Sequence, residues 1–120
     1  MKLKTIDAKE ADRLVAGGAA LLDVRERHEI DREQIEGAVA VPLSRFAEAD
    51  LEPFRGRKVI FFCHSGGRTR LYAAKLAARL QGIGEGYVLS GGIVAWRKAG
   101  LKTSLGPRPP GLLARLFGSK

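Results

Sequence analysis

The residues best placed to do chemistry surround Cys63, the only cysteine of the chain, in the run Cys63-His64-Ser65-Gly66-Gly67-Arg68-Thr69. The glycine pair allows backbone conformations that are closed to other residues, so several amide N–H groups can point at one atom. A helix that starts directly after the run would add its unpaired N–H groups and the positive end of its dipole. Cysteines in such places have pKa values of about 3.5–7.5, against about 8.5 for a free thiol. The run therefore predicts that main-chain donors hold the sulfur of Cys63 anionic and exposed, as a nucleophile.

A buried structural cysteine is the alternative, because free cysteine is among the most buried residue types. We favour the nucleophile because a strand end, a glycine pair, an arginine and a helix start coincide here. Ser65 and Thr69 could donate hydroxyl hydrogen bonds, although Thr69 could equally cap the helix. His64 invites a role as general base, yet a loop with its amides turned inward tends to turn its side chains outward. The predicted substrate-binding residues are those that follow the cysteine: His64, Ser65, Gly66, Gly67, Arg68 and Thr69.

Apolar runs predict the strands that position this loop. The strongest cover residues 19–24, 58–62 and 86–89, and weaker ones cover 38–41 and 3–6. Segments with helical spacing lie between them, over residues 8–16, 26–34, 69–80 and 93–99. This alternation predicts an α/β fold, a doubly wound domain with a mostly parallel sheet of about five strands and helices on both faces. Cys63 would then lie at the carboxyl end of a strand, where open α/β sheets bind ligands.

Residues 69–80 form the clearest predicted helix, because Tyr72, Leu76 and Leu80 recur on one side and Gly82 follows as a stop signal. Gly91 and Gly92 predict a turn, and Trp96 is expected to pack in the core. We expect the domain to span residues 1–100. Residues 101–120 are expected to form a Pro/Gly linker and a short basic tail, either amphipathic and able to bind a protein partner or disordered.

The length, cysteine content and net charge of the chain restrict the class of protein. A chain of 120 residues suits one domain with its own core, and it has no secretory-signal pattern or run of transmembrane length. One cysteine allows no internal disulfide and no multi-cysteine metal site, so we expect a cytoplasmic protein without metal or other cofactor. The formal charge of +8 attracts anions in general. Because the basic residues are scattered and not interleaved with aromatic ones, nucleic-acid binding is disfavoured.

Four motifs, in this order, resemble those of the rhodanese-like sulfurtransferases. They are Leu21-Leu22-Asp23-Val24-Arg25-Glu26, Ile35-Glu36-Gly37-Ala38 followed by Val41-Pro42, the loop from Cys63 to Arg68, and Leu89-Ser90-Gly91-Gly92-Ile93-Val94-Ala95-Trp96. The resemblance covers the first hundred residues and leaves out the tail. The chain departs from the family pattern at Glu33-Gln34, where glycine and histidine are common, and at Glu36, where proline is common.

The resemblance implies a thiosulfate sulfurtransferase. The Cys63 thiolate would take the outer sulfur of thiosulfate, or of another sulfane-sulfur donor, as a persulfide, while Arg68 binds the sulfonate oxygens. A thiol or cyanide would then remove the sulfur, and since the chain has no second cysteine the acceptor must come from outside. Asp23 and Arg25 are expected to form a supporting pair near the loop.

Two alternatives stay open at this point. The same persulfide could be relayed to or from a partner protein that docks on the basic surface or the tail. A phosphatase or arsenate reductase of the same fold is the other alternative. In those relatives five residues separate the cysteine from the arginine, whereas here His64, Ser65, Gly66 and Gly67 are four, which disfavours phosphoryl chemistry.

Overall fold

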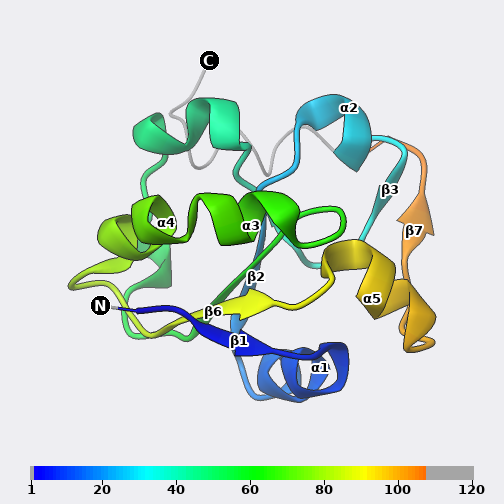
Figure 1. The fold of residues 1–120 in the computed structure, drawn as a ribbon, viewed down its shortest axis with the longest axis horizontal. Coiled ribbons are helices and arrows are strands. Elements are labelled where there is room, and N and C mark those ends of the chain that lie inside the picture. Colours follow the sequence, from blue (N-terminus) through cyan, green and yellow to red (C-terminus); the bar gives the residue numbers. More distant parts are fainter. Residues whose placement is uncertain (1, 108–120) are drawn as a thin grey trace.

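The computed structural model describes residues 2–107, and a parallel sheet lies at its centre (Figure 1). Its five strands pair in the order β1-β6-β5-β2-β4, and every pairing is parallel. The strands are β1 (Lys4–Ile6), β2 (Ala20–Asp23), β4 (Val39–Ala40), β5 (Val59–Phe62) and β6 (Gly86–Leu89). Each lies within a run predicted from the sequence. The predicted α/β class with a mostly parallel sheet of about five strands is confirmed.

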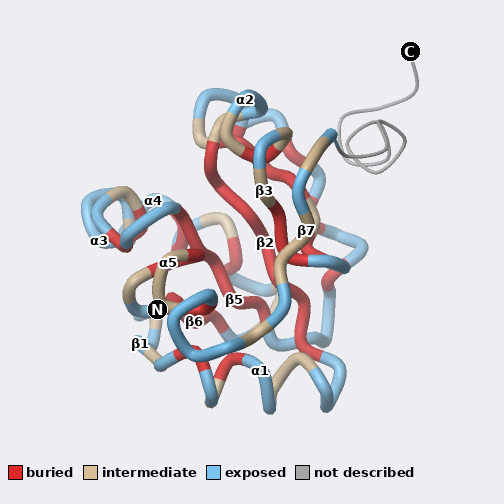
Figure 2. Tube along the Cα trace, turned by 90° about the vertical axis from the view of Figure 1, so that its right-hand side faces the viewer, coloured by how far each residue is buried: buried red, intermediate tan, exposed pale blue. Residues whose placement is uncertain are grey.

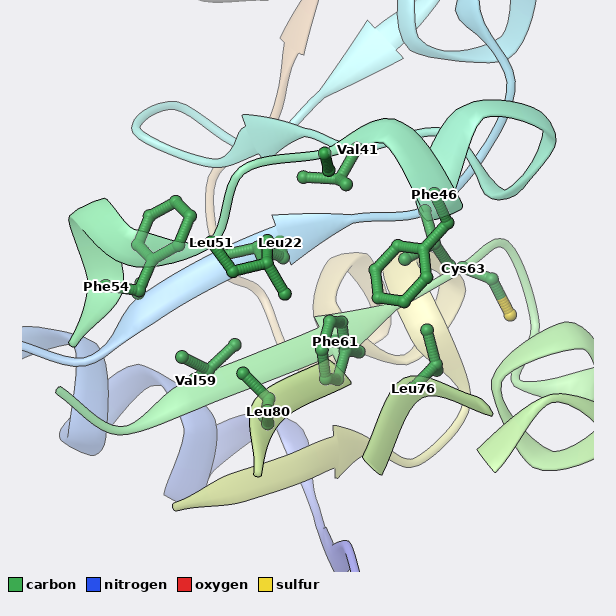
Figure 3. Close-up of a cluster of buried hydrophobic side chains, with 13 residues drawn as sticks. Leu22, Val41, Phe46, Leu51, Phe54, Val59, Phe61, Cys63, Leu76 and Leu80 are labelled. Carbon is green, nitrogen blue, oxygen red and sulfur yellow. The ribbon is translucent and has the colours of Figure 1, made fainter. Parts of the chain in front are cut away.

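Alternating side chains along the central strand β5 pack into two separate hydrophobic cores, one on each face of the sheet. Val59, Phe61 and Cys63 belong to a cluster that includes Leu76 and Leu80 of the helix α4 (Ala73–Leu80). The same cluster contains one phenylalanine from each of two 3-10 helices, η1 (Leu43–Glu48) and η2 (Glu52–Phe54). Figure 3 shows this cluster packed between β5, β2 and those helices.

The opposite face of the sheet is covered by α1 (Ala8–Ala16) and α5 (Gly92–Lys98). Ile60 and Phe62 point to this side and share a cluster with Ile93 and Trp96 of α5. Trp96 is buried, which confirms its predicted packing in the core. Both faces of the sheet are therefore covered by helices, and Figure 2 shows the buried strands between exposed outer surfaces.

The helix predicted over residues 69–80 is longer and interrupted. It begins at Gly67 as α3 (Gly67–Leu71) and continues after Tyr72 as α4. Gly66 precedes it in the left-handed conformation, with a φ of 100°, which a glycine adopts without strain. The helix therefore starts only four residues after Cys63, and the loop between them is correspondingly tight.

The helix predicted over residues 26–34 is wrong in its second half. The helix α2 (Arg27–Ile30) is one turn long, and Glu33 and Gln34 instead form β3 (Glu33–Gln34), which pairs antiparallel with β7 (Ser104–Leu105). Gln34 also donates its side-chain amide to the carbonyl of Gly106 at 2.7 Å. These contacts come from the far end of the chain, so local periodicity could not reveal them.

The described chain continues to pack on the domain after Gly100. The indole nitrogen of Trp96 donates to the carbonyl of Lys102 at 3.0 Å, and the hydroxyl of Thr103 donates to Glu33 at 2.6 Å. The predicted linker and tail beyond Pro107 lie outside the described residues. Among residues 2–107, no helix is both long and apolar enough to cross a membrane.

Candidate active site

Cys63 follows the last residue of β5, and the chain then curls back over its sulfur. The N–H of Gly66 donates to Sγ at 3.2 Å, and the hydroxyl oxygen of Thr69 lies 3.8 Å from Sγ. The Thr69 hydroxyl also lies 3.2 Å from the carbonyl oxygen of Gly66, to which it can donate. One main-chain donor and one hydroxyl group thus meet at the sulfur atom.

Burial and hydrogen bonding act on the Cys63 thiol in opposite directions. Burial raises its pKa, while the N–H and hydroxyl of Thr69 and the N–H groups of Gly66 and Arg68 lower it. The donors outweigh the burial, so the pKa lies below its ordinary value. A larger fraction of this thiol is therefore ionised at neutral pH than of a free cysteine.

The prediction of an exposed sulfur is wrong, because Cys63 is only 1% exposed. Its side chain belongs to the hydrophobic cluster that packs against α4. Figure 3 shows, however, that the sulfur points away from Phe46 and Phe61 of that cluster. The physical reason lies in the loop itself: the buried N–H of Gly66 needs an acceptor, and the sulfur supplies one. A reagent can reach the sulfur only when the loop moves.

The start of α5 fixes the loop from the other side. The N–H groups of Ile93 and Val94 donate to the carbonyls of Cys63 and His64 at 3.0 and 3.1 Å. Because a trans peptide points its N–H away from its C=O, the next two N–H groups of the loop turn away from α5. The approach is possible because position 92 is glycine: a Cβ there would lie 2.3 Å from the carbonyl oxygen of Cys63. The sequence predicted only a turn at Gly92.

Arg68 reaches across the site to α2. Its Nη1 and Nη2 each donate to a carboxylate oxygen of Glu29 at 2.7 Å, and both side chains are partly exposed. The hydrogen bond from Arg68 lowers the pKa of Glu29 to about 2 despite the opposing effect of burial. Glu29 was missed by the sequence analysis, since nothing local indicates a partner 39 residues away. The cation predicted to bind the donor therefore already has a carboxylate partner.

Asp23 and Arg25 form a fully buried ion pair below the loop. Nη2 of Arg25 donates to Oδ2 of Asp23 at 2.7 Å and Nε donates to Oδ1 at 3.0 Å. The same Nη2 donates to the carbonyl of Glu33 at 2.7 Å, so the pair ties β2 to β3. The guanidinium also lies 5.9 Å from the ring centroid of Phe62, the residue before Cys63. The geometry matches a structural role for this pair.

The remaining predicted site residues lie on the outer surface of the loop. His64, Ser65 and Gly67 are exposed, whereas Gly66 and Thr69 are buried against the sulfur. This separation follows from turning the amides inward. Among residues 2–107, no group of three or more histidine, cysteine, aspartate or glutamate side chains could hold a metal ion.

Comparison with known proteins places these features in a family. Residues 7–99 match the model of the rhodanese-like domain. A protein of Allochromatium vinosum called a sulfurtransferase is 35% identical over 81 residues, which cover 68% of this chain and 74% of that protein. An uncharacterized protein of Synechocystis is 38% identical over 84 residues, 69% of this chain but only 45% of that protein.

The solved structures agree with this result. The crystal structure of a thiosulfate sulfurtransferase from Pseudomonas aeruginosa matches with a TM-score of 0.71 at 25% identity, covering 88% of this chain and 20% of that one. This chain therefore corresponds to about one fifth of the length of that protein. Since the family model spans more than half of the sequence, this chain belongs to the rhodanese-like domain family.

Proposed function

We propose that this protein is a sulfurtransferase that moves sulfane sulfur from thiosulfate, or from a persulfide donor, to a thiol or cyanide. The observation that carries the proposal is the donation of main-chain N–H groups to the Cys63 sulfur at the carboxyl end of β5. Those donors favour a thiolate, and the outer sulfur of a persulfide carries the same kind of negative charge. The family and the name of the relative from Allochromatium vinosum support the same reaction class.

The first half-reaction charges the cysteine. The Cys63 thiolate attacks the outer sulfur of thiosulfate, a new S–S bond forms, and the S–S bond of thiosulfate breaks. Sulfite leaves with the bonding electron pair, so Cys63 becomes a persulfide without any external oxidant. The backbone N–H groups of residues 64 to 68 would stabilise the charge on the transferred sulfur.

The second half-reaction unloads it. An acceptor thiolate or cyanide attacks the outer sulfur, and the Cys63 thiolate leaves with its electron pair. Cys63 itself is only 1% exposed, so the loop has to open before the first half-reaction can begin. His64 and Ser65 are exposed on the outer surface of the loop, and we propose that they contact donor and acceptor there.

Arg68 is the cation that we assign to the sulfonate oxygens of the donor. A guanidinium has five N–H donors, and two of them are engaged by Glu29. The donor can therefore bind the remaining N–H groups while Glu29 still holds the side chain in place. Metal and cofactor are not needed in any of these steps.

Mass spectrometry of the intact protein tests the proposal. Thiosulfate should increase the mass by one sulfur atom, a reductant should remove it, and Cys63→Ser should not gain it. Cyanide added to the charged protein should yield thiocyanate. An unchanged mass together with the absence of thiocyanate would contradict the proposal. Hydrolysis of a phosphate ester by a protein that ignores thiosulfate would favour the phosphatase alternative instead.

A further inference from the structure

A cavity of about 410 Å³ lies beside the loop of Cys63, on the face of the sheet that α3 and α4 cover. Its volume falls in the range of about 300–1,000 Å³ that is typical of small-molecule sites. Figure 1 shows the elements that surround it, with α3 and α4 above and β6 and β1 below. Of the predicted site residues, only Gly66 and Thr69 line the cavity.

The cavity exists because small residues face the edge of the sheet at this point. Leu76 and Leu80 of α4 fill the core over β5 and are fully buried. The side of α4 toward β6 and β1 carries Ala73, Ala74 and Ala77, which line the cavity. Methyl groups are too short to bridge the distance to the outer strands, so a space remains between helix and sheet.

The lining has an apolar part and a cationic part. Leu3, Val88 and Leu89 contribute its apolar surface together with the alanines. Lys2 and Arg70 line it as exposed cations, and neither forms an ion pair with any other residue in the described part of the chain. None of the described residues that line the cavity carries a carboxylate. This combination complements a molecule with an apolar body and one negative charge.

The cavity is also coupled to the active-site loop by direct contact. Gly66 and Thr69 line it, and the same two residues approach the sulfur of Cys63 at 3.2 and 3.8 Å. A molecule packed against them would restrain the loop that has to open before Cys63 can react.

We propose that this cavity binds a small amphipathic anion, with its apolar body against Val88, Leu89 and the alanines of α4 and its charge beside Arg70 and Lys2, and that the bound molecule restrains the loop over Cys63. Because the tests need no sulfur donor, the proposal stands or falls independently of the sulfurtransferase reaction.

Binding is tested with octanoate as the probe and octanol as its neutral match, followed by NMR of the backbone amides. Octanoate should cause saturable shifts at Gly66, Thr69, Ala73 and Ala77. Octanol should bind about fivefold more weakly, because it has no carboxylate to interact with the exposed cations Lys2 and Arg70. Shifts that do not saturate, or equal affinity for both compounds, would overturn the proposed ligand class.

Variants locate the bound molecule. Ala74→Phe places a ring in the cavity, because helical side chains lean toward the N-terminus, and should weaken octanoate binding by at least about tenfold. Its control is Ala16→Phe, an exposed position of α1 on the other face of the sheet. Arg70→Gln should weaken octanoate but not octanol, whereas Lys75→Gln, an exposed cation of α4 outside the lining, should change neither. Equal effects of target and control variants would contradict this location.

The restraint on the loop is measured by alkylation of Cys63 with iodoacetamide. Saturating octanoate should slow the alkylation of the unmodified protein severalfold, and Ala74→Phe should need at least about tenfold more octanoate for the same effect. An unchanged rate at full occupancy would overturn the coupling between the cavity and the loop.

Discussion

At the scale of single residues, the reactivity of Cys63 depends on a few donors that compete with burial. Thr69 contributes both its N–H and its hydroxyl, and these are the largest effects that lower the pKa of the thiol. Its hydroxyl hydrogen can point either to the sulfur or to the carbonyl of Gly66, but not to both at once. The charge on the sulfur decides which of the two it prefers.

Thr69→Val therefore tests this hydroxyl with little change in shape. The pKa of Cys63 should rise by about one unit, since a hydrogen bond to a charged group contributes about 1.5–3 kcal/mol. The pH dependence of alkylation by iodoacetamide measures the shift. Thr69→Ser keeps the hydroxyl and should restore most of the original profile. If Thr69→Val and the unmodified protein titrate alike, the hydroxyl does not stabilise the thiolate.

The ion pair of Glu29 and Arg68 makes the free energy of unfolding depend on pH. The pKa of Glu29 is lowered from 4.5 to about 2 in the folded protein, first of all by the hydrogen bond from Arg68. A lowered carboxyl pKa stabilises the fold above the unfolded value, and this stabilisation is lost as the pH falls from about 4.5 to about 2. Because both side chains are partly exposed, the pair contributes only about 1 kcal/mol.

Glu29→Gln should therefore lose about 1 kcal/mol of unfolding free energy at neutral pH and show a shallower decline between pH 4.5 and 2. Urea unfolding at a series of pH values measures both effects. Glu36→Gln removes the same charge at an exposed position and serves as the control. Parallel pH profiles for Glu29→Gln and the unmodified protein would show that the pair does not stabilise the fold.

At the scale of elements, the loop after β5 keeps its shape because α5 begins directly beneath it. A Cβ at position 92 would lie 2.3 Å from the carbonyl oxygen of Cys63 and 2.5 Å from that of His64, and backbone atoms cannot move aside cheaply. Gly82 offers a matched control, because it has a φ of +81° but no atom within 4 Å of its Cβ position. Both glycines have a positive φ, but Gly92 is buried against the loop, whereas Gly82 is exposed with open space at its Cβ position.

Gly82→Ala should cost about 1–2 kcal/mol of unfolding free energy, the penalty of a left-handed conformation alone. Gly92→Ala should cost more than about 3 kcal/mol and should also change the rate of Cys63 alkylation, because the loop has to shift. Chemical denaturation and alkylation kinetics of both variants provide the measurement. Equal costs would mean that the contact between α5 and the loop is not tight.

The elements also show how far the sequence could predict this molecule. The five strands of the parallel sheet and the run from Cys63 to Thr69 are contiguous and locally patterned, so they were predictable. Glu29 and Gly92 act on the loop from other elements, and their partners are identified only by the fold. The pairing of β3 with β7 was missed for the same reason, since each strand is two residues long and gains its hydrogen bonds from distant chain.

The contacts after Gly100 predict that truncation there is costly. A protein without residues 101–120 loses the pairing of β3 with β7 and the carbonyl that accepts the Trp96 indole hydrogen bond. It should be less stable than a protein without residues 108–120 by about 2–3 kcal/mol. Thermal and urea unfolding of the two truncations measures this difference, and equal stability would contradict it. The shorter deletion is therefore the better test for a partner that docks on the tail.

At the scale of the whole molecule, the formal charge of +8 creates a field that anions experience before they reach the loop. Iodoacetate and iodoacetamide carry nearly the same reactive group but differ by one negative charge, so the ratio of their alkylation rates at Cys63 isolates this effect. The ratio should fall about two- to fivefold when the ionic strength rises from about 0.02 to about 0.5 M, because salt screens the field. The rate for neutral iodoacetamide serves as the internal control and should stay nearly constant, since it responds to loop opening but not to charge. If the ratio does not depend on salt, the positive charge lies too far from the loop to attract an anionic sulfur donor, and Arg68, paired with Glu29, would have to bind it through local contacts alone.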